Sequence, residues 1–211
     1  SDEGYHGVII INQTREIHIH QPHDDSENPS VWAESGANLG SIARRTALRG
    51  YAGLEWAAGI PATIGGAVYG NAGARDGNTQ NSLILAEILH RYSGEVITDM
   101  WSSEKLDYQY RSSILKRHPE IYAGNFVILS AEMKLVRSTR EAVQAKIDEY
   151  NEKRHRTQPQ GASTGSTFKN PPGDYAGRLI EAAGLKGTRI GDAEFSTLHA
   201  NFILNNGKAK A

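Results

Sequence analysis

The chain of 211 residues contains no cysteine. This absence excludes disulfides, thiolate nucleophiles and cysteine-ligated metals, and it suits a protein of the reducing cytoplasm. An excess of charge is also absent, since 23 Lys and Arg oppose 24 Asp and Glu and the net charge is −1. No global field therefore favours nucleic acid or a membrane surface as a partner. An anionic ligand would need a local cluster of residues.

Long apolar runs are absent too. No run approaches the roughly 20 residues that span a bilayer, and residues 1–4 lack the basic and then apolar pattern of a signal peptide. Both ends resemble the interior of a domain, because strand-like residues 8–11 follow the start almost at once and residues 205–211 close no element. We expect a piece of a longer cytoplasmic protein, without membrane insertion and without a predicted protein partner.

The pattern of apolar residues predicts an α+β fold, because helices and strands mix without the regular alternation of a doubly wound sheet. Residues 7–20 are expected to form two short strands, an apolar run at 8–11 and then an alternation through Ile17 and Ile19. Further strand-like runs lie at residues 31–34, 126–136 and 202–204, and a hairpin is indicated over residues 83–98 with Ser93 and Gly94 at its turn. Helical patterns lie at about 38–50, 138–154 and 175–183. The second is expected to open with a capping box that starts at Ser138 and to bury Val143, Ile147 and Tyr150, and the third to end at Gly184. A domain boundary is expected around residues 140–157, along the long helix, and the expected domains are 1–140 and 141–211.

Residues 59–74 carry no charge and are rich in glycine and alanine, so we expect a functional loop here. In residues 59–67 (GIPATIGGA) the glycines and small side chains allow backbone amides to approach a phosphate or a flat ring closely. A tight turn packed on a neighbouring element explains the same composition equally well. The spacing matches neither the dinucleotide fingerprint nor a P-loop.

Residues 161–171 (GASTGSTFKNP) contain two candidate serines. Ser163 fits the G-x-S-x-G pattern of serine hydrolases, but that pattern requires a preceding strand and a following helix, and neither is predicted here. Ser166 stands beside a glycine and is followed by Lys169 and Asn170, so its hydroxyl could lie near an anionic ligand. An ordinary polar loop is the competing interpretation.

Histidines and one arginine complete the candidates. His18, His20 and His23 are close in sequence, but exposure to solvent on a strand and a loop is favoured over a metal site. We expect His199 to be a structural hydrogen-bonding residue. Arg111 is suited to a carboxylate or an enolate because its guanidinium is planar and permanently charged. A packing role or a surface ion pair is the alternative for this arginine.

Several short motifs follow one another in a family order. They are GLEW at 53–56, GIPATIGGA at 59–67, NAGA at 71–74, YRSSILK at 110–116, RTQP at 156–159, GSTFKNP at 165–171, AGLKG at 183–187 and STLHANFILN at 196–205. In this order, over essentially the whole chain, the sequence resembles the UDP-N-acetylenolpyruvoylglucosamine reductase family, also called the UDP-N-acetylmuramate dehydrogenases. The short link from Arg111 to the 138–154 helix resembles the shorter subtype, which lacks a tyrosine-bearing insertion.

The resemblance implies an FAD-binding domain of the vanillyl-alcohol-oxidase (PCMH) type, followed by an α+β substrate-binding domain. It implies that NADPH reduces FAD and that hydride then passes to the enolpyruvyl double bond of a UDP-sugar, giving UDP-N-acetylmuramate for peptidoglycan. Ser166 would donate the proton and Arg111 would stabilise the enolate, with no metal. The other implied site residues are Gly59, Ile60, Pro61, Ala62, Gly65, Gly66, Ala67 and Asn71 for the cofactor, and Tyr110, Arg156, Lys169 and Asn170 for the substrate.

The sequence also departs from the family pattern. The family's glycine-rich pyrophosphate loop lies upstream of residue 1, and the glutamate that partners the arginine lies beyond Ala211. Ala62, Ala162 and Asp192 stand where other residues are commoner in the family. We expect the chain alone to bind FAD poorly and to turn over little or not at all. A non-catalytic module that binds flavin or a nucleotide sugar is the alternative to an enzyme.

Overall fold

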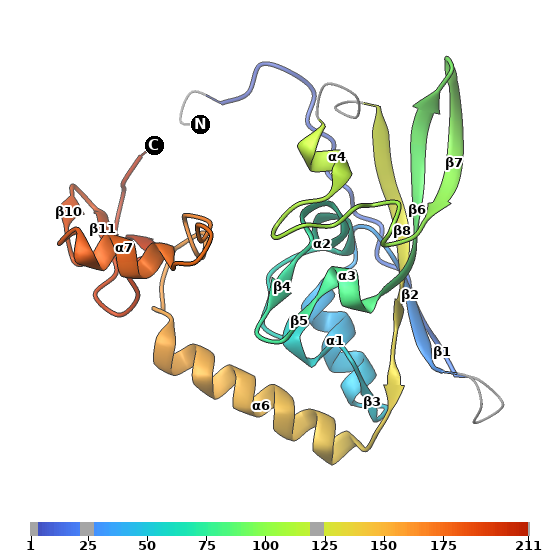
Figure 1. Cartoon of the computed structure of the whole chain (residues 1–211), viewed down its shortest axis with the longest axis horizontal. Helices are drawn as coiled ribbons and strands as arrows, with labels where there is room; N and C mark the ends of the chain where they lie inside the picture. The colour runs from blue at the N-terminus through green and yellow to red at the C-terminus, as the bar shows by residue number, and fades with distance from the viewer. Residues whose placement is uncertain (1–3, 22–27, 119–124, 211) are drawn as a thin grey trace. The chain divides into compact units, whose positions relative to one another are not determined.

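The computed structural model describes residues 4–21, 28–118 and 125–210, and the chain divides into two compact units. The larger unit comprises the described residues of 10–150, and the smaller unit comprises those of 1–9 and 151–211. Helix α6, Arg140–Thr157, begins in the larger unit and ends in the smaller one (Figure 1). Both units combine helices with antiparallel strands, so the predicted α+β class is confirmed.

A five-stranded antiparallel sheet is the frame of the larger unit, in the order β1-β2-β8-β6-β7. Its strands are β1 (Ile17–His20), β2 (Ser30–Glu34), β6 (Leu83–Tyr92), β7 (Glu95–Trp101) and β8 (Phe126–Lys134). The hairpin of β6 and β7 turns at Ser93 and Gly94, which both have positive φ, as the sequence predicted. Two small pairs join β3 (Tyr51–Ala52) to β9 (Val136–Arg137) and β4 (Gly73–Ala74) to β5 (Gly77–Asn78).

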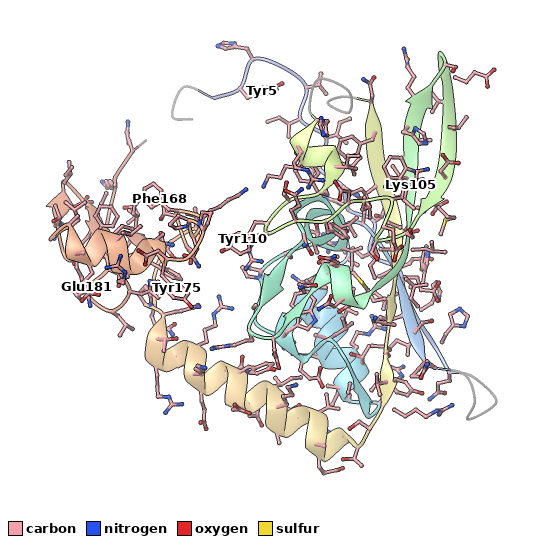
Figure 2. The ribbon with its side chains drawn as sticks, viewed as in Figure 1. Tyr5, Lys105, Tyr110, Phe168, Tyr175 and Glu181 are labelled. Carbon is pink, nitrogen blue, oxygen red and sulfur yellow. The ribbon has the colours of Figure 1, made fainter. Side chains whose placement is uncertain are left out.

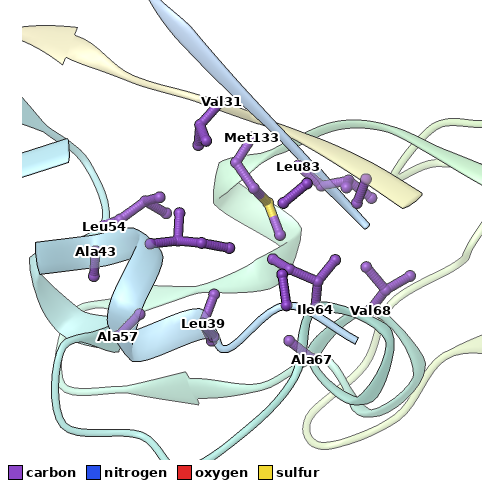
Figure 3. Close-up of a cluster of buried hydrophobic side chains, with 14 of the residues drawn as sticks. Val31, Leu39, Ala43, Leu54, Ala57, Ile64, Ala67, Val68, Leu83 and Met133 are labelled. Atoms are coloured by element: carbon purple, nitrogen blue, oxygen red, sulfur yellow. The ribbon is translucent and has the colours of Figure 1, made fainter. Parts of the chain in front are cut away.

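Short helices pack against this sheet and close its core. The helical segments are α1 (Leu39–Ala47), the 3-10 helix η1 (Glu55–Ala57), α2 (Ile64–Gly70), α3 (Thr79–Ser82) and α4 (Ile114–Arg117). Figure 3 shows side chains of α1, α2, β2 and β8 meeting in one cluster, in which Leu39, Ile64 and Met133 are fully buried. Burial of each such side chain contributes about 1.5–3 kcal/mol. This cluster fixes the start of α2 against the sheet.

Two predictions from the sequence, at residues 8–11 and 59–74, are wrong. Residues 8–11 form no strand, because no strand of the described chain pairs with them, and the Ile10 side chain is 87% exposed. Residues 59–74 are not loop throughout, because α2 forms inside them. Its glycines disfavour a helix by propensity alone, but the Thr63 hydroxyl caps the first turn by accepting the Gly66 N–H at 3.2 Å. Burial of the apolar face of α2 then stabilises the helix.

Helix α6 begins as the sequence predicted, with one change at its cap. The hydroxyl of Thr139, rather than that of Ser138, accepts the Ala142 N–H at 3.2 Å. Val143 and Ile147 are buried on the predicted apolar face. None of the helices in the described ranges has the length and apolar character needed to cross a membrane.

The smaller unit combines the end of α6 and a second helix with a small sheet. Helix α7 (Ala176–Ala182) is followed by Gly184 in a left-handed conformation with φ of 72°, as the sequence predicted. Strands β10 (Arg189–Ile190), β11 (Ala193–Phe195) and β12 (Ile203–Asn205) form an antiparallel sheet in that order. The serine loop, residues 161–171, lies between α6 and α7 in sequence.

Candidate functional site

A groove of about 390 Å³ lies beside the N-terminus of α2 in the larger unit. It brings together polar groups and flat apolar side chains from segments far apart in the sequence. The rings of Tyr69 and Phe126 stack with their centroids 5.9 Å apart. The groove is lined by Asn12, Ser35, Gly36, Thr63, Gly65, Gly66, Tyr69, Phe126 and Ile128.

The two glycines at the start of α2 have different surroundings. The Gly65 N–H donates to the Ser35 carbonyl at 2.8 Å, and a Cβ added at Gly65 would lie 3.0 Å from Ser35 Cβ. A Cβ added at Gly66 would meet only the Thr63 hydroxyl oxygen, at 3.4 Å. Gly65 therefore allows the helix to approach the sheet, whereas Gly66 keeps space open in the groove.

Arg111 lies on a tight turn of the larger unit. The backbones of Gln109 and Ser112 bond to each other across it at 2.9 and 3.1 Å. Arg111 itself has a φ of 53°, a left-handed conformation that is uncommon for a residue other than glycine and is concentrated at functional sites. Its guanidinium donates to the Gly73 carbonyl of β4 and lies 5.2 Å from the centre of the Tyr110 ring. The direction of this cation is thus set by the protein backbone.

Asn71 and Ser113 attach the Arg111 turn to α2. Asn71 is 5% exposed, and its side chain donates to the Gln109 carbonyl and accepts the Gln80 N–H, both at 3.0 Å. The fully buried Ser113 hydroxyl donates to the Tyr69 carbonyl at 2.7 Å. The amide of Asn71, which the resemblance assigned to the cofactor, is therefore bonded within the protein on both sides.

The smaller unit contains a cavity of about 490 Å³ with Ser166 in its wall. The Ser166 hydroxyl forms no hydrogen bond with any described residue. The side chains that Figure 2 labels include the cavity residues Tyr175 and Glu181 and the loop residue Phe168. The full lining is Ser166, Asn170, Tyr175, Gly177, Arg178, Glu181, Leu198, His199, Ala200 and Asn201.

The serine loop is attached to both α7 and the turn before β12. Ser166 forms an isolated antiparallel bridge with Phe202, and the Thr167 N–H donates to the Asn201 carbonyl at 2.8 Å. The side-chain oxygen of Asn170 accepts the N–H of Ala176, the first residue of α7, at 3.0 Å. Asn170 therefore helps to begin the helix and also lines the cavity.

An ion pair lies at the edge of this cavity. The Arg178 side chain donates to both carboxylate oxygens of Asp174, with Nε 2.6 Å from Oδ1. These bonds lower the pKa of Asp174 to about 2, so the pair is ionised at neutral pH. Lys169 and Arg156 are exposed, and neither forms an ion pair with a described residue.

The remaining candidates from the sequence are Ser163 and the histidines. Ser163 is exposed in a coil that follows α6, without a preceding strand or a following helix, so the hydrolase interpretation is rejected. His18 and His20 are exposed on β1, whereas His23 lies outside the described residues. No group of three possible metal ligands occurs in the described part of the chain. His199 accepts the Asn201 N–H on Nδ1 at 3.2 Å, as expected for a structural residue.

Comparison with known proteins identifies both parts of the chain. Residues 2–99 match the model of the FAD binding domain, and residues 157–211 match the C-terminal domain of UDP-N-acetylenolpyruvoylglucosamine reductase. The UDP-N-acetylenolpyruvoylglucosamine reductase of Chloroflexus aggregans is 47% identical over 100% of this chain and 68% of its own length. The chain belongs to the UDP-N-acetylenolpyruvoylglucosamine reductase family. The family resemblance found in the sequence is thereby confirmed.

Other members of the family show a similar sequence identity and coverage. The protein of the same name from Chloroflexus aurantiacus is 46% identical, again over 100% of this chain and 68% of its own length. The crystal structure of UDP-N-acetylenolpyruvylglucosamine reductase from Thermus caldophilus matches with a TM-score of 0.74 and 37% identity, over 85% of this chain and 63% of that one. The chain thus spans about two thirds of the length of these family members.

Sequence reasoning missed several residues of the groove and the cavity. Thr63 had a detectable signal, because a threonine directly before an apolar helical face is a typical N-cap. Asn201 stands in the family motif at residues 196–205, but the motif alone gave it no role. The groove residues Ser35 and Phe126 and the cavity residue Tyr175 had no signal. They reach these sites through strand pairing and loop packing, which no local pattern in the sequence reports.

Proposed function

We propose that this chain is part of an enzyme that reduces UDP-N-acetylglucosamine enolpyruvate to UDP-N-acetylmuramate, with FAD as cofactor and NADPH as reductant. The product serves peptidoglycan synthesis, and hence cell shape and division, in the cytoplasm. The observation that supports this proposal most directly is the unbonded Ser166 hydroxyl in a cavity of the unit that matches the reductase C-terminal domain. We place the FAD-binding domain within residues 1–140 and the substrate-binding domain within residues 141–211.

The groove beside α2 has the chemistry that a flat, polar-edged cofactor needs. The stacked rings of Tyr69 and Phe126 offer an apolar wall, and the Thr63 hydroxyl, which accepts the Gly66 N–H, still has its own proton to donate to a ligand. Gly66 leaves open the space that a Cβ would fill. FAD, when bound, would supply hydride transfer. We assign it the segment Gly59, Ile60, Pro61, Ala62, Gly65, Gly66 and Ala67, and we assign Asn71 to the support of the Arg111 turn.

The reaction requires a cation and a proton donor besides the hydride. Hydride addition to the enolpyruvyl double bond leaves negative charge on the carbon beside the carboxylate. The Arg111 guanidinium would stabilise that charge, since it is permanently protonated and directed by the Gly73 carbonyl. The Ser166 O–H would then protonate the carbon and regain its proton from solvent. In sum, the double bond gains one hydride from NADPH and one proton, and NADP⁺ is released.

The remaining polar side chains would bind the substrate. Lys169 and Arg156 are exposed cations without a described partner, suited to the diphosphate. Asn170 retains its amide group for the sugar, and Tyr110, beside Arg111, is 54% exposed and available for contact. These roles are proposals for single residues and can be tested one at a time.

The decisive test separates the two half-reactions in an intact, FAD-loaded enzyme that contains this chain. Ser166→Ala should leave flavin reduction by NADPH unchanged and slow flavin reoxidation by the enolpyruvyl substrate by about 10²–10⁴-fold, the usual contribution of a positioned proton donor. Ser163→Ala is the matched control and should change neither rate. Normal reoxidation by Ser166→Ala would contradict the proposal. A wild-type protein that retains FAD but is not bleached by NADPH would favour a non-catalytic module.

A further inference from the structure

We infer that Asn201 is a positioning residue that holds Ser166 in place for proton transfer, an inference that rests on the proposed function. Asn201 lies in the turn before β12, in the wall of the same cavity, and is 3% exposed. A buried polar side chain needs hydrogen-bond partners. Asn201 finds its partners in the serine loop.

The Asn201 side chain binds the serine loop as a second peptide group would. Its Oδ1 accepts the Phe168 N–H at 2.9 Å, and its Nδ2 donates to the Phe168 carbonyl at 2.8 Å. Its own backbone carbonyl accepts the Thr167 N–H at 2.8 Å. Together with the Ser166–Phe202 bridge, these bonds hold residues 166–168 along the turn. The side-chain amide thus extends a one-residue bridge into a three-residue clamp.

The clamp is itself anchored in the fold. The Asn201 N–H donates to His199 Nδ1 at 3.2 Å. The hydroxyl of Ser196, which is 1% exposed, accepts the N–H groups of Leu198 and His199 at 3.1 and 3.3 Å. The Ser196 N–H donates to the Phe202 carbonyl at 2.8 Å. The turn at residues 196–202 is therefore closed by its own hydrogen bonds, which is the support that a precisely placed group needs.

The clamp holds the backbone of residues 166–168 and leaves the Ser166 hydroxyl without a bond to the described residues. Its hydrogen bonds to Asn201 and Phe202 all involve the serine-loop backbone, and none involves the Ser166 hydroxyl, which is left available at the cavity. The backbone that carries the hydroxyl is held in place, while the hydroxyl itself is bonded to none of the described residues. A misplacement of about 1 Å can cost about 10²-fold in rate, so loss of the clamp should slow the step that uses Ser166. A purely structural asparagine would affect that step no more than the others.

The first experiment compares half-reactions in the intact, FAD-loaded enzyme. Asn201→Ala should slow flavin reoxidation by the enolpyruvyl substrate by about 10–10²-fold and leave FAD content and flavin reduction by NADPH unchanged. Asn206→Ala is the matched control, since that exposed side chain donates to Glu194 at 2.8 Å rather than to the serine loop, and it should behave as wild type. Equal slowing of both half-reactions by Asn201→Ala, or of neither, would overturn the inference.

Two further variants make the test specific. The double variant Ser166→Ala with Asn201→Ala should be no slower than Ser166→Ala alone, because residues that act on one step are not additive. Multiplied defects would overturn the inference, whereas normal reoxidation by Ser166→Ala alone would contradict the proposed function instead. Asn201→Asp keeps the acceptor for the Phe168 N–H and regains a donor only when its carboxyl is protonated. Its reoxidation rate should therefore rise relative to wild type as the pH falls, and a parallel pH profile would count against the clamp even if Asn201→Ala fails to fold.

Discussion

Gly65 and Gly66, which are neighbours at the start of α2, allow the same substitution to alanine to be compared in two different surroundings. Gly65→Ala places a methyl group 3.0 Å from Ser35 Cβ and 3.3 Å from the Ser35 carbonyl oxygen. Gly66→Ala places it 3.4 Å from the Thr63 hydroxyl and otherwise in the groove. We expect the first change to reduce the stability of the fold and the second to reduce the affinity for FAD.

The magnitude follows from what the two variants share. Both replace glycine by alanine within the first turn of α2, so the gain in helix propensity, at most about 1 kcal/mol, is common to both. The difference between them isolates the contact with Ser35. Overpacking of a well-filled site costs about 1–3 kcal/mol, so Gly65→Ala should be less stable than Gly66→Ala by about that amount. For FAD the order reverses, and Gly66→Ala should weaken binding about 10-fold, which corresponds to about 1.4 kcal/mol.

Both quantities can be measured on the same two variants of the intact enzyme. Urea denaturation without FAD gives the unfolding free energy, and an unchanged slope against urea shows that the same surface unfolds. Titration of FAD by fluorescence gives the dissociation constant. Equal stability of the two variants would refute the packing argument at Ser35. Wild-type FAD affinity in Gly66→Ala would refute the assignment of the groove to the flavin.

Two other predictions concern the supports of the site. Ser113→Ala removes the buried hydroxyl that donates to the Tyr69 carbonyl, so we expect a loss of about 1–3 kcal/mol in unfolding free energy by urea denaturation; an unchanged midpoint would show that this bond adds nothing. Because the pKa of Asp174 is lowered to about 2 from 3.8, the stabilisation by its pair with Arg178 is complete above pH 3.8 and is lost as the pH falls towards 2. In Arg178→Gln the pKa of Asp174 should return towards 3.8 in an NMR titration, and an unchanged pKa would exclude the arginine as the cause.

The sequence predicted correctly those secondary-structure elements that depend only on residues close to one another in the chain. The hairpin at Ser93 and Gly94 needs only two residues that tolerate positive φ, and the apolar spacing of α6 is sufficient to define its buried face. The strand predicted at residues 8–11 is wrong because a strand needs a partner, and none of the described strands pairs with it. Helix α2 was not predicted, because its glycines disfavour a helix by propensity. Tertiary packing nevertheless stabilises it.

The sequence by itself determined the family, the α+β class and the segments that contain Arg111 and Ser166, because ordered motifs identify a relative without any knowledge of distances. Only the tertiary structure decided what those segments contact. It showed that Asn71 is bonded to the Arg111 turn, that Gly65 and Gly66 have different surroundings, and that Asn201 clamps the serine loop. Such contacts join residues up to tens of positions apart, and their geometry depends on strand pairing and packing rather than on residue type.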